Sequence, residues 1–304
     1  MSSPAGRVRR SEQPIRELLT RNTSVEQITS RRNPIVARFR RIARSSTPTN
    51  STVLLEGPRL IEEALAAGIQ IELAAVSTDA AVARRSTALL DRLDPAATRL
   101  VRVSPTVMDA LSPASTPAGL VALGTLHTTS FDAAAPPEGP LVLGLLGVQD
   151  PGNIGAVIRA VEAGGATGVV TVGGADPYGW KALRGSMGSA FRLPIVRIGD
   201  AAEALVEAAT RGLRVLAAVP RGGTTVSATD LREPCLIWLG GEGVGLDASV
   251  VNAADAVVSI PMHPPVQSLN IAVAAALIVY EAARQRAGAT QTAAPGGRGR
   301  RRSA

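Results

Sequence analysis

Short apolar runs alternate with helix-like stretches throughout the second half of this 304-residue chain. Each run has the length of one strand and carries apolar residues at consecutive positions, which is typical of a strand buried on both faces. The runs occupy residues 141–147, 168–172, 194–198, 213–219, 235–239 and 256–260. This pattern predicts an α/β fold in which helices cover both faces of a parallel sheet.

The first half repeats the alternation on a smaller scale. Its helix-like stretches occupy residues 35–43, 59–67, 80–93 and 106–111, and its strand-like runs occupy residues 53–55, 71–76, 100–103 and 119–126. We therefore expect a smaller α/β domain over residues 31–127. Residues 128–140 are rich in alanine and proline and have the composition of an exposed linker to a second domain at residues 141–287.

Arginine is concentrated at the two ends of the chain. Residues 1–50 contain eleven arginines against three glutamates, and residues 288–304 contain four arginines, whereas the whole chain has a net charge of +7. Residues 1–30 have little apolar periodicity and residues 288–304 are rich in arginine and glycine, so both segments are predicted to be disordered. Basic ends flanking a mildly acidic middle favour contact with a polyanion, and RNA is the partner we expect.

The sequence also bounds the compartment and the cofactor class. No apolar run approaches the roughly 18 residues of a membrane helix, and no apolar signal segment follows the arginine-rich start. We therefore expect a cytoplasmic protein without membrane contact. The single cysteine, Cys235, lies in an apolar run, where a small buried residue is the simplest interpretation. The chain has no zinc-binding or redox motif, so no metal is expected.

Three polar motifs lie at the ends of predicted strands and helices. They are Asp150-Pro151-Gly152-Asn153, the glycine run 240–245 after the strand 235–239, and Ser268-Leu269-Asn270 before an alanine-rich helix. Glycine lets the backbone approach a ligand at the carboxyl end of a parallel strand, although a glycine run is equally consistent with a tight turn. A Ser-Leu-Asn helix start offers a capping hydroxyl, a side-chain amide and free N–H groups to a polar ligand.

Together with Ser259-Ile260-Pro261-Met262, these motifs resemble the three signature motifs of SpoU-type (TrmH-type) RNA ribose 2′-O-methyltransferases of the SPOUT superfamily. The resemblance implies a trefoil-knotted SPOUT domain at residues 141–287 and an L30e-like substrate-binding domain at residues 31–127. It also implies a homodimer that transfers a methyl group from S-adenosylmethionine to a ribose 2′-hydroxyl. Ribosomal RNA is the expected substrate, because the added L30e-like domain resembles that of the ribosomal-RNA members. Transfer-RNA methylation and a non-catalytic role in ribosome assembly are the alternatives.

The resemblance further implies roles for individual residues. Those implied for catalysis are Asn153, Arg159, Glu242, Ser268 and Asn270. Those implied for cofactor binding are Leu239, Gly240, Gly241, Gly243, Ile260, Met262, Ser268, Leu269 and Asn270. Those expected to contact RNA are Arg38, Arg41, Arg59 and Arg184.

Simpler structural interpretations stand beside these roles. Arg159 would otherwise pair with Glu162 one helical turn away, for ~0.2–0.5 kcal/mol, and Ser268 would cap the following helix. Because a guanidinium stays protonated, Arg159 is a poor general base, and we expect it to act electrostatically on a phosphate and a developing alkoxide. The loop 263–265, His-Pro-Pro, stands where family members commonly carry glycine, which predicts a stiffer cofactor loop.

Overall fold

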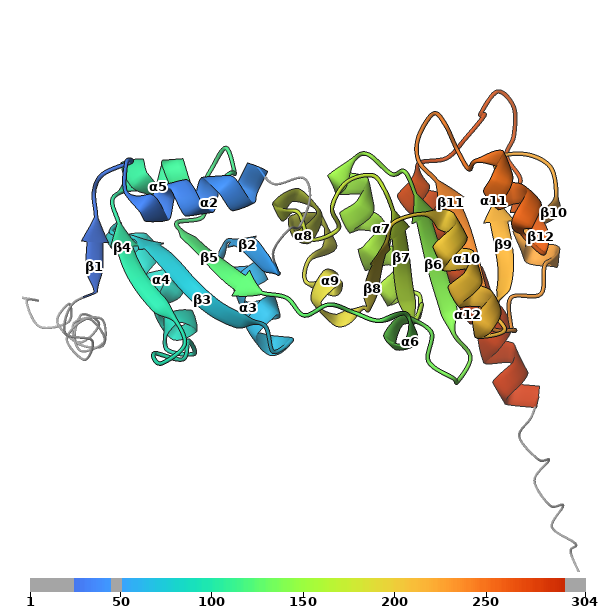
Figure 1. Cartoon of the computed structure of the whole chain (residues 1–304), viewed down its shortest axis with the longest axis horizontal. Helices are drawn as coiled ribbons and strands as arrows, with labels where there is room; N and C mark the ends of the chain where they lie inside the picture. The colour runs from blue at the N-terminus through green and yellow to red at the C-terminus, as the bar shows by residue number, and fades with distance from the viewer. Residues whose placement is uncertain (1–24, 45–50, 293–304) are drawn as a thin grey trace, which may run out of the picture. The chain divides into compact units, whose positions relative to one another are not determined.

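The computed structural model describes residues 25–44 and 51–292, which form two compact units (Figure 1). The first unit comprises the described residues up to Thr128 together with Asp176–Arg192. The second comprises Thr129–Ala175 and the described residues from Leu193 onward. The arginines at residues 1–24 and 293–304 lie outside the described residues, so their predicted contact with RNA stays a prediction.

The first unit is the expected smaller α/β domain. Its mixed sheet has the order β1-β4-β3-β5-β2, with β5 antiparallel to both β2 and β3. The strands are β1 (Glu26–Ile28), β2 (Thr52–Glu56), β3 (Gln70–Ser77), β4 (Arg99–Val103) and β5 (Leu120–Thr125). The helices are α2 (Pro34–Arg44), α3 (Pro58–Ala66), α4 (Ala80–Leu90), α5 (Pro105–Leu111), α8 (Trp180–Ser186) and α9 (Ser189–Arg192).

Helices cover both faces of this sheet. Helices α2 and α5 pack on each other and on one face, where Phe39 is fully buried in an apolar cluster. Helices α3 and α4 pack on the other face. The amphipathic pattern of residues 34–44 explains the placement of α2, because Ile35, Val36 and Phe39 are buried while the intervening arginines are not.

The prediction of disorder through residue 30 is wrong for the last residues of that segment. Glu26–Ile28 forms β1, which pairs in parallel with Val101–Val103 of β4. The side chain of Ile28 is only 3% exposed. A strand of three residues with one inward side chain leaves no periodicity in the sequence, so pattern analysis could not detect it.

The second unit is the predicted parallel sheet, and the fold class is confirmed. All seven strands run parallel in the order β10-β12-β9-β11-β6-β7-β8. They are β6 (Leu141–Leu146), β7 (Gly168–Val172), β8 (Ile195–Ile198), β9 (Arg214–Ala218), β10 (Thr224–Thr225), β11 (Cys235–Gly240) and β12 (Ala256–Ser259). The helices are α6 (Phe131–Ala134), α7 (Pro151–Ala163), α10 (Ala201–Thr210), η1 (Val226–Ala228), α11 (Ala248–Ala253) and α12 (Ile271–Thr292).

The linker prediction needs correction within residues 128–140. Phe131 and Ala134 of α6 are buried in the apolar cluster that also holds residues of α10 and β11. Arg211 also holds α6 in place. Its guanidinium lies 4.9 Å from the Phe131 ring centroid, donates a hydrogen bond to the Asp132 carboxylate and forms an ion pair with it. A segment rich in alanine and proline has the composition of a linker, but one buried aromatic ring is enough to anchor it.

Helix α12 is longer than predicted and is fastened near its far end. It continues to Thr292, beyond the predicted start of the disordered tail at residue 288. The Arg286 guanidinium donates to the carbonyl oxygens of Leu231, Gly139, Pro140 and Glu233. The neighbouring Cys235 is buried as expected, and burial raises the pKa of its thiol to about 11.

Among the described helices, none has the length and hydropathy needed to cross a membrane.

The neighbouring strands β6 and β11 pack closely because a tryptophan in β11 lies opposite a glycine in β6. The fully buried ring of Trp238 in β11 lies over Gly144 in β6, where a Cβ atom would come within 2.3 Å of the Trp238 ring atom Cε3. We expect Gly144→Ala to lower the free energy of unfolding by about 1–3 kcal/mol, because a rigid indole cannot yield to an overpacked methyl group. Urea denaturation would measure this, and an unchanged midpoint would contradict it.

Candidate functional site

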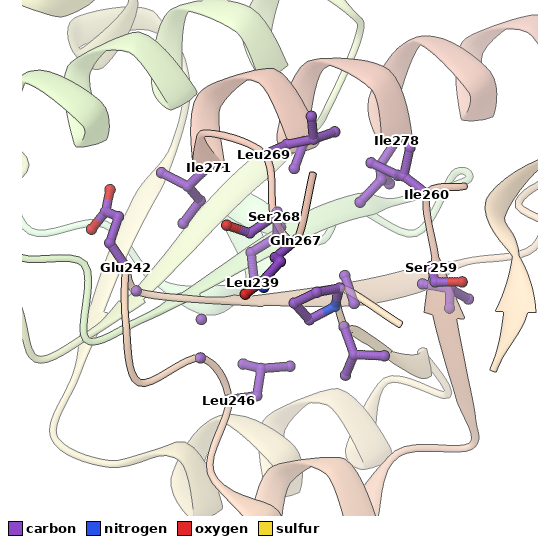
Figure 2. Close-up of a pocket in the computed structure, with 18 of the residues that line it drawn as sticks. Leu239, Glu242, Leu246, Ser259, Ile260, Gln267, Ser268, Leu269, Ile271 and Ile278 are labelled. Carbon is purple, nitrogen blue, oxygen red and sulfur yellow. The ribbon is translucent and has the colours of Figure 1, made fainter. Parts of the chain in front are cut away.

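The segments that follow β9, β11 and β12 meet at the carboxyl ends of these strands and enclose a pocket of about 490 Å³. The loop after β11 contributes residues 241–246, and the segment between β12 and α12 contributes Ile260, Met262 and Gln267–Leu269. Figure 2 shows the labelled side chains around one hollow, with Glu242 at its edge. Ligands of open parallel sheets bind at this edge, so the pocket lies where the fold predicts a site.

Glycine is required in the loop after β11 for two different reasons. A Cβ atom at Gly240 would lie 2.1 Å from the carbonyl carbon of Gly245, and one at Gly241 would lie 2.3 Å from the oxygen of Gly147. Gly243 and Gly245 instead have φ angles of 88° and 74°, which side chains rarely tolerate. The run is therefore both a tight turn and a pocket wall made of bare backbone, so the two interpretations of the sequence do not exclude each other.

A hydrogen-bonded network of three side chains joins the three polar motifs. The Asn153 amide nitrogen donates to Glu242 Oε1 at 2.5 Å, and the Asn153 amide oxygen accepts from the Asn270 amide at 3.0 Å. Asp150 caps α7 by accepting from the Asn153 backbone N–H at 2.8 Å, which fixes Asn153 from the main-chain side. The network ties the first turn of α7 and the start of α12 to the glycine loop.

Asn270, rather than Ser268, caps helix α12. The Asn270 side-chain oxygen accepts from the backbone N–H of Ala272 at 2.9 Å, and its carbonyl oxygen accepts from Ala274. The expectation that Ser268 would cap the helix is therefore wrong, because the helix begins two residues later than its pattern suggested. Ser268 instead lines the pocket.

Arg159 lies on the exposed face of α7, two turns beyond Asn153. The expected apolar side of this helix is confirmed, since Ile154, Val157 and Ile158 are buried. Within the described residues, Arg159 has no hydrogen-bond or ion-pair partner, so the predicted pairing with Glu162 is not formed. A charged group with no protein partner is available to an anion.

The structure separates the predicted residues into groups. Those expected to bind a cofactor all line the pocket except Asn270, which adjoins it. Wall residues that the sequence did not single out include Val219, Pro220, Val226 and Ile278. These come from three separate segments, and no local pattern marks them as neighbours.

The arginines expected to contact RNA also differ from one another. Arg38 forms an ion pair with Glu72 of β3, and both side chains are about one-third exposed. Arg41, Arg59 and Arg184 are exposed, and none of them makes an ion pair with a described carboxylate. No described cluster of histidine, cysteine or carboxylate side chains is arranged to hold a metal ion.

Comparison with known proteins decides the family. A model described as the SpoU rRNA Methylase family matches residues 140–280. The chain is 34% identical over 265 residues to an uncharacterized tRNA/rRNA methyltransferase of Synechocystis, covering 86% of this chain and 95% of the relative. The chain belongs to the SpoU family of RNA methyltransferases.

Three further comparisons extend the similarity to both units. The chain is 30% identical to the 23S rRNA (guanosine(2553)-2′-O)-methyltransferase RlmP of Bacillus subtilis, covering 84% of this chain and 98% of the relative. The SpoU methyltransferase AviRb of Streptomyces viridochromogenes, solved in complex with AdoMet, is 29% identical with a TM-score of 0.74, covering 83% of this chain and 98% of that one. A model described as an MRM3-like substrate binding domain matches residues 40–122 of the first unit.

Proposed function

We propose that this protein transfers a methyl group from S-adenosylmethionine to a ribose 2′-hydroxyl of ribosomal RNA. The observation that carries the proposal is the pocket at the carboxyl ends of β11 and β12, where bare glycine backbone faces the same cavity as Ser268 and Leu269. SpoU relatives of the same fold include a structure solved with AdoMet and an enzyme named for ribose methylation of 23S rRNA. Both the pocket and the family thus support one chemistry.

The pocket residues suit an adenosyl ligand. Leu239, Leu246 and Ile278 supply apolar walls for a flat base, and backbone groups at Gly240, Ile260 and Leu269 offer hydrogen bonds to its edge. Of the described lining residues, only Glu242 is ionisable, so the one fixed charge at the rim is opposite in sign to a sulfonium. When bound, S-adenosylmethionine supplies an activated methyl group.

The remaining motif residues are assigned to the acceptor. Arg159, with its free guanidinium, would hold a phosphate next to the target ribose and stabilise the alkoxide that forms as the hydroxyl loses its proton. Ser268, which lines the pocket, is assigned to the boundary between donor and acceptor, and Asn153, Glu242 and Asn270 are assigned to holding the surrounding loops through their hydrogen bonds. Fixing two reactants in one geometry contributes a large part of such a rate enhancement.

Cofactor binding is the direct test of this proposal. We expect the purified protein to bind S-adenosylmethionine in a calorimeter in the presence of EDTA, because the proposed contacts are apolar walls and backbone groups of the pocket and involve no metal ion. It should then methylate 23S rRNA transcribed in vitro. Folded protein that shows no heat of binding at millimolar ligand would contradict the proposal.

Ribosomal RNA is proposed over transfer RNA because the chain carries a complete additional α/β unit and resembles a 23S rRNA enzyme over nearly the whole length of that relative. Reverse-transcription stops at low dNTP, compared between RNA from cells with and without the gene, would locate the modified nucleotide. A stop that disappears from transfer RNA instead would favour the alternative substrate. If the protein binds rRNA but the reverse-transcription stops are the same in cells with and without the gene, a non-catalytic assembly factor is favoured.

Helix α12 also supports a homodimer. Val273, Leu277 and Tyr280 lie along one stripe of this helix, and each is about half exposed. Apolar residues at this spacing usually pack against another element, so we infer that a second copy of the chain covers them. We expect Leu277→Glu to convert a dimer into a monomer in sedimentation analysis, because a carboxylate in an apolar interface is costly. A wild-type protein that sediments as a monomer would contradict the homodimer.

The remaining expectations belong to the same proposal. We place the protein in the cytoplasm, because its proposed substrate is ribosomal RNA. We also propose that the segment leading into α12 is threaded as a trefoil knot, which is supported by the position of β12 beside β9 in the sheet and by SpoU membership. Arg41, Arg59 and Arg184 are proposed RNA contacts, whereas Arg38 is assigned to its ion pair with Glu72.

A further inference from the structure

The segment Asp176–Arg192 lies in sequence between β7 and β8 of the second unit but folds with the first. Trp180 packs against the apolar cluster of the first unit, and α8 contacts β2. At its other end Arg192 pairs with Glu63 of α3 at 2.5 Å. Gly188 has a φ of 90° and passes so close that a Cβ atom would lie 2.7 Å from Glu63. The segment is therefore anchored to the first unit at both ends.

Two cations of this segment are held around an aromatic ring. Lys181 Nζ lies 5.6 Å and Arg184 Cζ lies 5.4 Å from the centroid of the Trp180 ring. Both side chains are exposed, and neither forms an ion pair with any carboxylate that the structure describes. Contact with a ring orients a cation without neutralising it, so both charges remain available to an anion.

Helix α2 adds two more cations on the same face of the sheet. Both α2 and α8 contact β2, and Ile42 of α2 packs against the same apolar cluster as Trp180. Arg41 and Arg44 flank Ile42 and are exposed, and within the described chain neither has an ion-pair partner. Arg38 and Arg40 of the same helix differ, because they bond to Glu72 and to the carbonyl oxygen of Ala110.

We propose that Arg41, Arg44, Lys181 and Arg184 form a phosphate-docking surface for the RNA substrate, which we call the α2–α8 surface. The inference rests on the proposed function, which makes RNA the polyanion. Four cations that are not neutralised by protein carboxylates suit a phosphodiester backbone, since each contact releases counterions from the nucleic acid. Trp180 acts as a positioning residue, because it anchors α8 in the core and orients two of the four cations.

The test uses full-length protein and a fluorescein-labelled oligouridylate as the probe. In Lys181→Gln/Arg184→Gln, and separately in Arg41→Gln/Arg44→Gln, we expect weaker binding and a log–log salt slope that is shallower by about 0.7 per lost contact. The fourfold variant should combine both losses. The matched control is Arg92→Gln/Arg102→Gln, which removes two charges from the opposite side of the same sheet and should bind as wild type.

Intrinsic fluorescence gives an independent readout. The chain has two tryptophans, and the other one, Trp238, is fully buried in the second unit. In a Trp238→Phe variant the emission reports on Trp180 alone, and we expect it to change as oligouridylate is added. A change that persists in the Lys181→Gln/Arg184→Gln background with unweakened binding would overturn the role of these two cations.

The outcomes separate this inference from the proposed function. If the fourfold variant keeps the wild-type affinity and salt slope, or if the control pair weakens binding equally, the α2–α8 surface is not the docking site. Binding to anionic phospholipid vesicles that is lost in the fourfold variant, without any RNA binding by wild type, would also overturn it. If the wild-type protein does not bind S-adenosylmethionine, the proposed methyltransferase function is contradicted. The RNA-binding measurements would still test the α2–α8 surface independently.

Discussion

Arg159→Ala is expected to abolish methyl transfer while leaving the protein folded and able to bind S-adenosylmethionine. Removing one preorganised charge from a transition state typically costs a factor of about 10²–10³ in rate. Because Arg159 is exposed and no described residue pairs with it, its removal breaks no hydrogen bond or ion pair among the described residues. Alanine is also the best helix former, so α7 should not weaken. Single-turnover methylation, calorimetry and thermal denaturation would measure the three effects separately.

Arg159→Lys is the matched variant. Lysine keeps the charge but loses the planar fork that binds a phosphate through two parallel hydrogen bonds, so we expect a rate between those of wild type and Arg159→Ala. A parallel fall in Tm, cofactor affinity and rate in Arg159→Ala would show that the arginine is structural. Equal rates in the two variants would show that charge alone contributes nothing.

Asn153→Asp is expected to open the loops around the pocket. The change removes the N–H group that donates to Glu242 and brings a second carboxylate within hydrogen-bond distance of the first. Two carboxylates cannot both stay ionised at that separation without strong repulsion. Loss of a hydrogen bond to a charged group costs about 1.5–3 kcal/mol, so affinity for S-adenosylmethionine should fall about 10- to 100-fold. Calorimetry at neutral pH would measure the loss.

Adding Glu242→Gln to this variant should restore the network. The new carboxylate at position 153 can accept from the amide introduced at position 242 and from the Asn270 amide, so every hydrogen bond is kept and only the charge has moved. We expect cofactor affinity to recover. If methylation recovers too, Glu242 acts by positioning the loops, and if it does not, the carboxylate is needed at its original place. A double variant as weak as Asn153→Asp would contradict the coupling.

Runs of apolar residues predicted four of the five strands of the first sheet and six of the seven strands of the second, because burial in a sheet requires apolar side chains. The two-residue strand β10 (Thr224–Thr225) has no apolar residue and was not predicted. In the other exceptions, one side chain decides the structure. Ile28 in β1 and Phe131 in α6 each anchor a segment too short to show a period. Both contacts are long-range, since β1 pairs with Val101–Val103 and α6 packs on β7 and β8. Only the folded structure brings such partners together.

For the site, the sequence identified the loops but not the contacts among their residues. Resemblance singled out Asn153, Glu242 and Asn270 separately, whereas their hydrogen bonds depend on side-chain directions that no spacing encodes. The same limit applies to Ser268 and Asn270, because either is a good cap by composition and only the first helical hydrogen bond decides between them. The glycine run was the most informative, since sterics alone explain its positions.

The fastening of residues 176–192 to the first unit has a consequence for synthesis on the ribosome. A domain normally completes its core as soon as its last residue has emerged, and the N-terminal one finishes first. Here Trp180 reaches the core of the first unit only after β6, α7 and β7 of the second have been made. The first unit therefore stays without α8 until Thr129–Ala175 of the second unit has been translated. A protein truncated at residue 140 would lack α8, and the surface of the first unit that Trp180 covers would stay exposed.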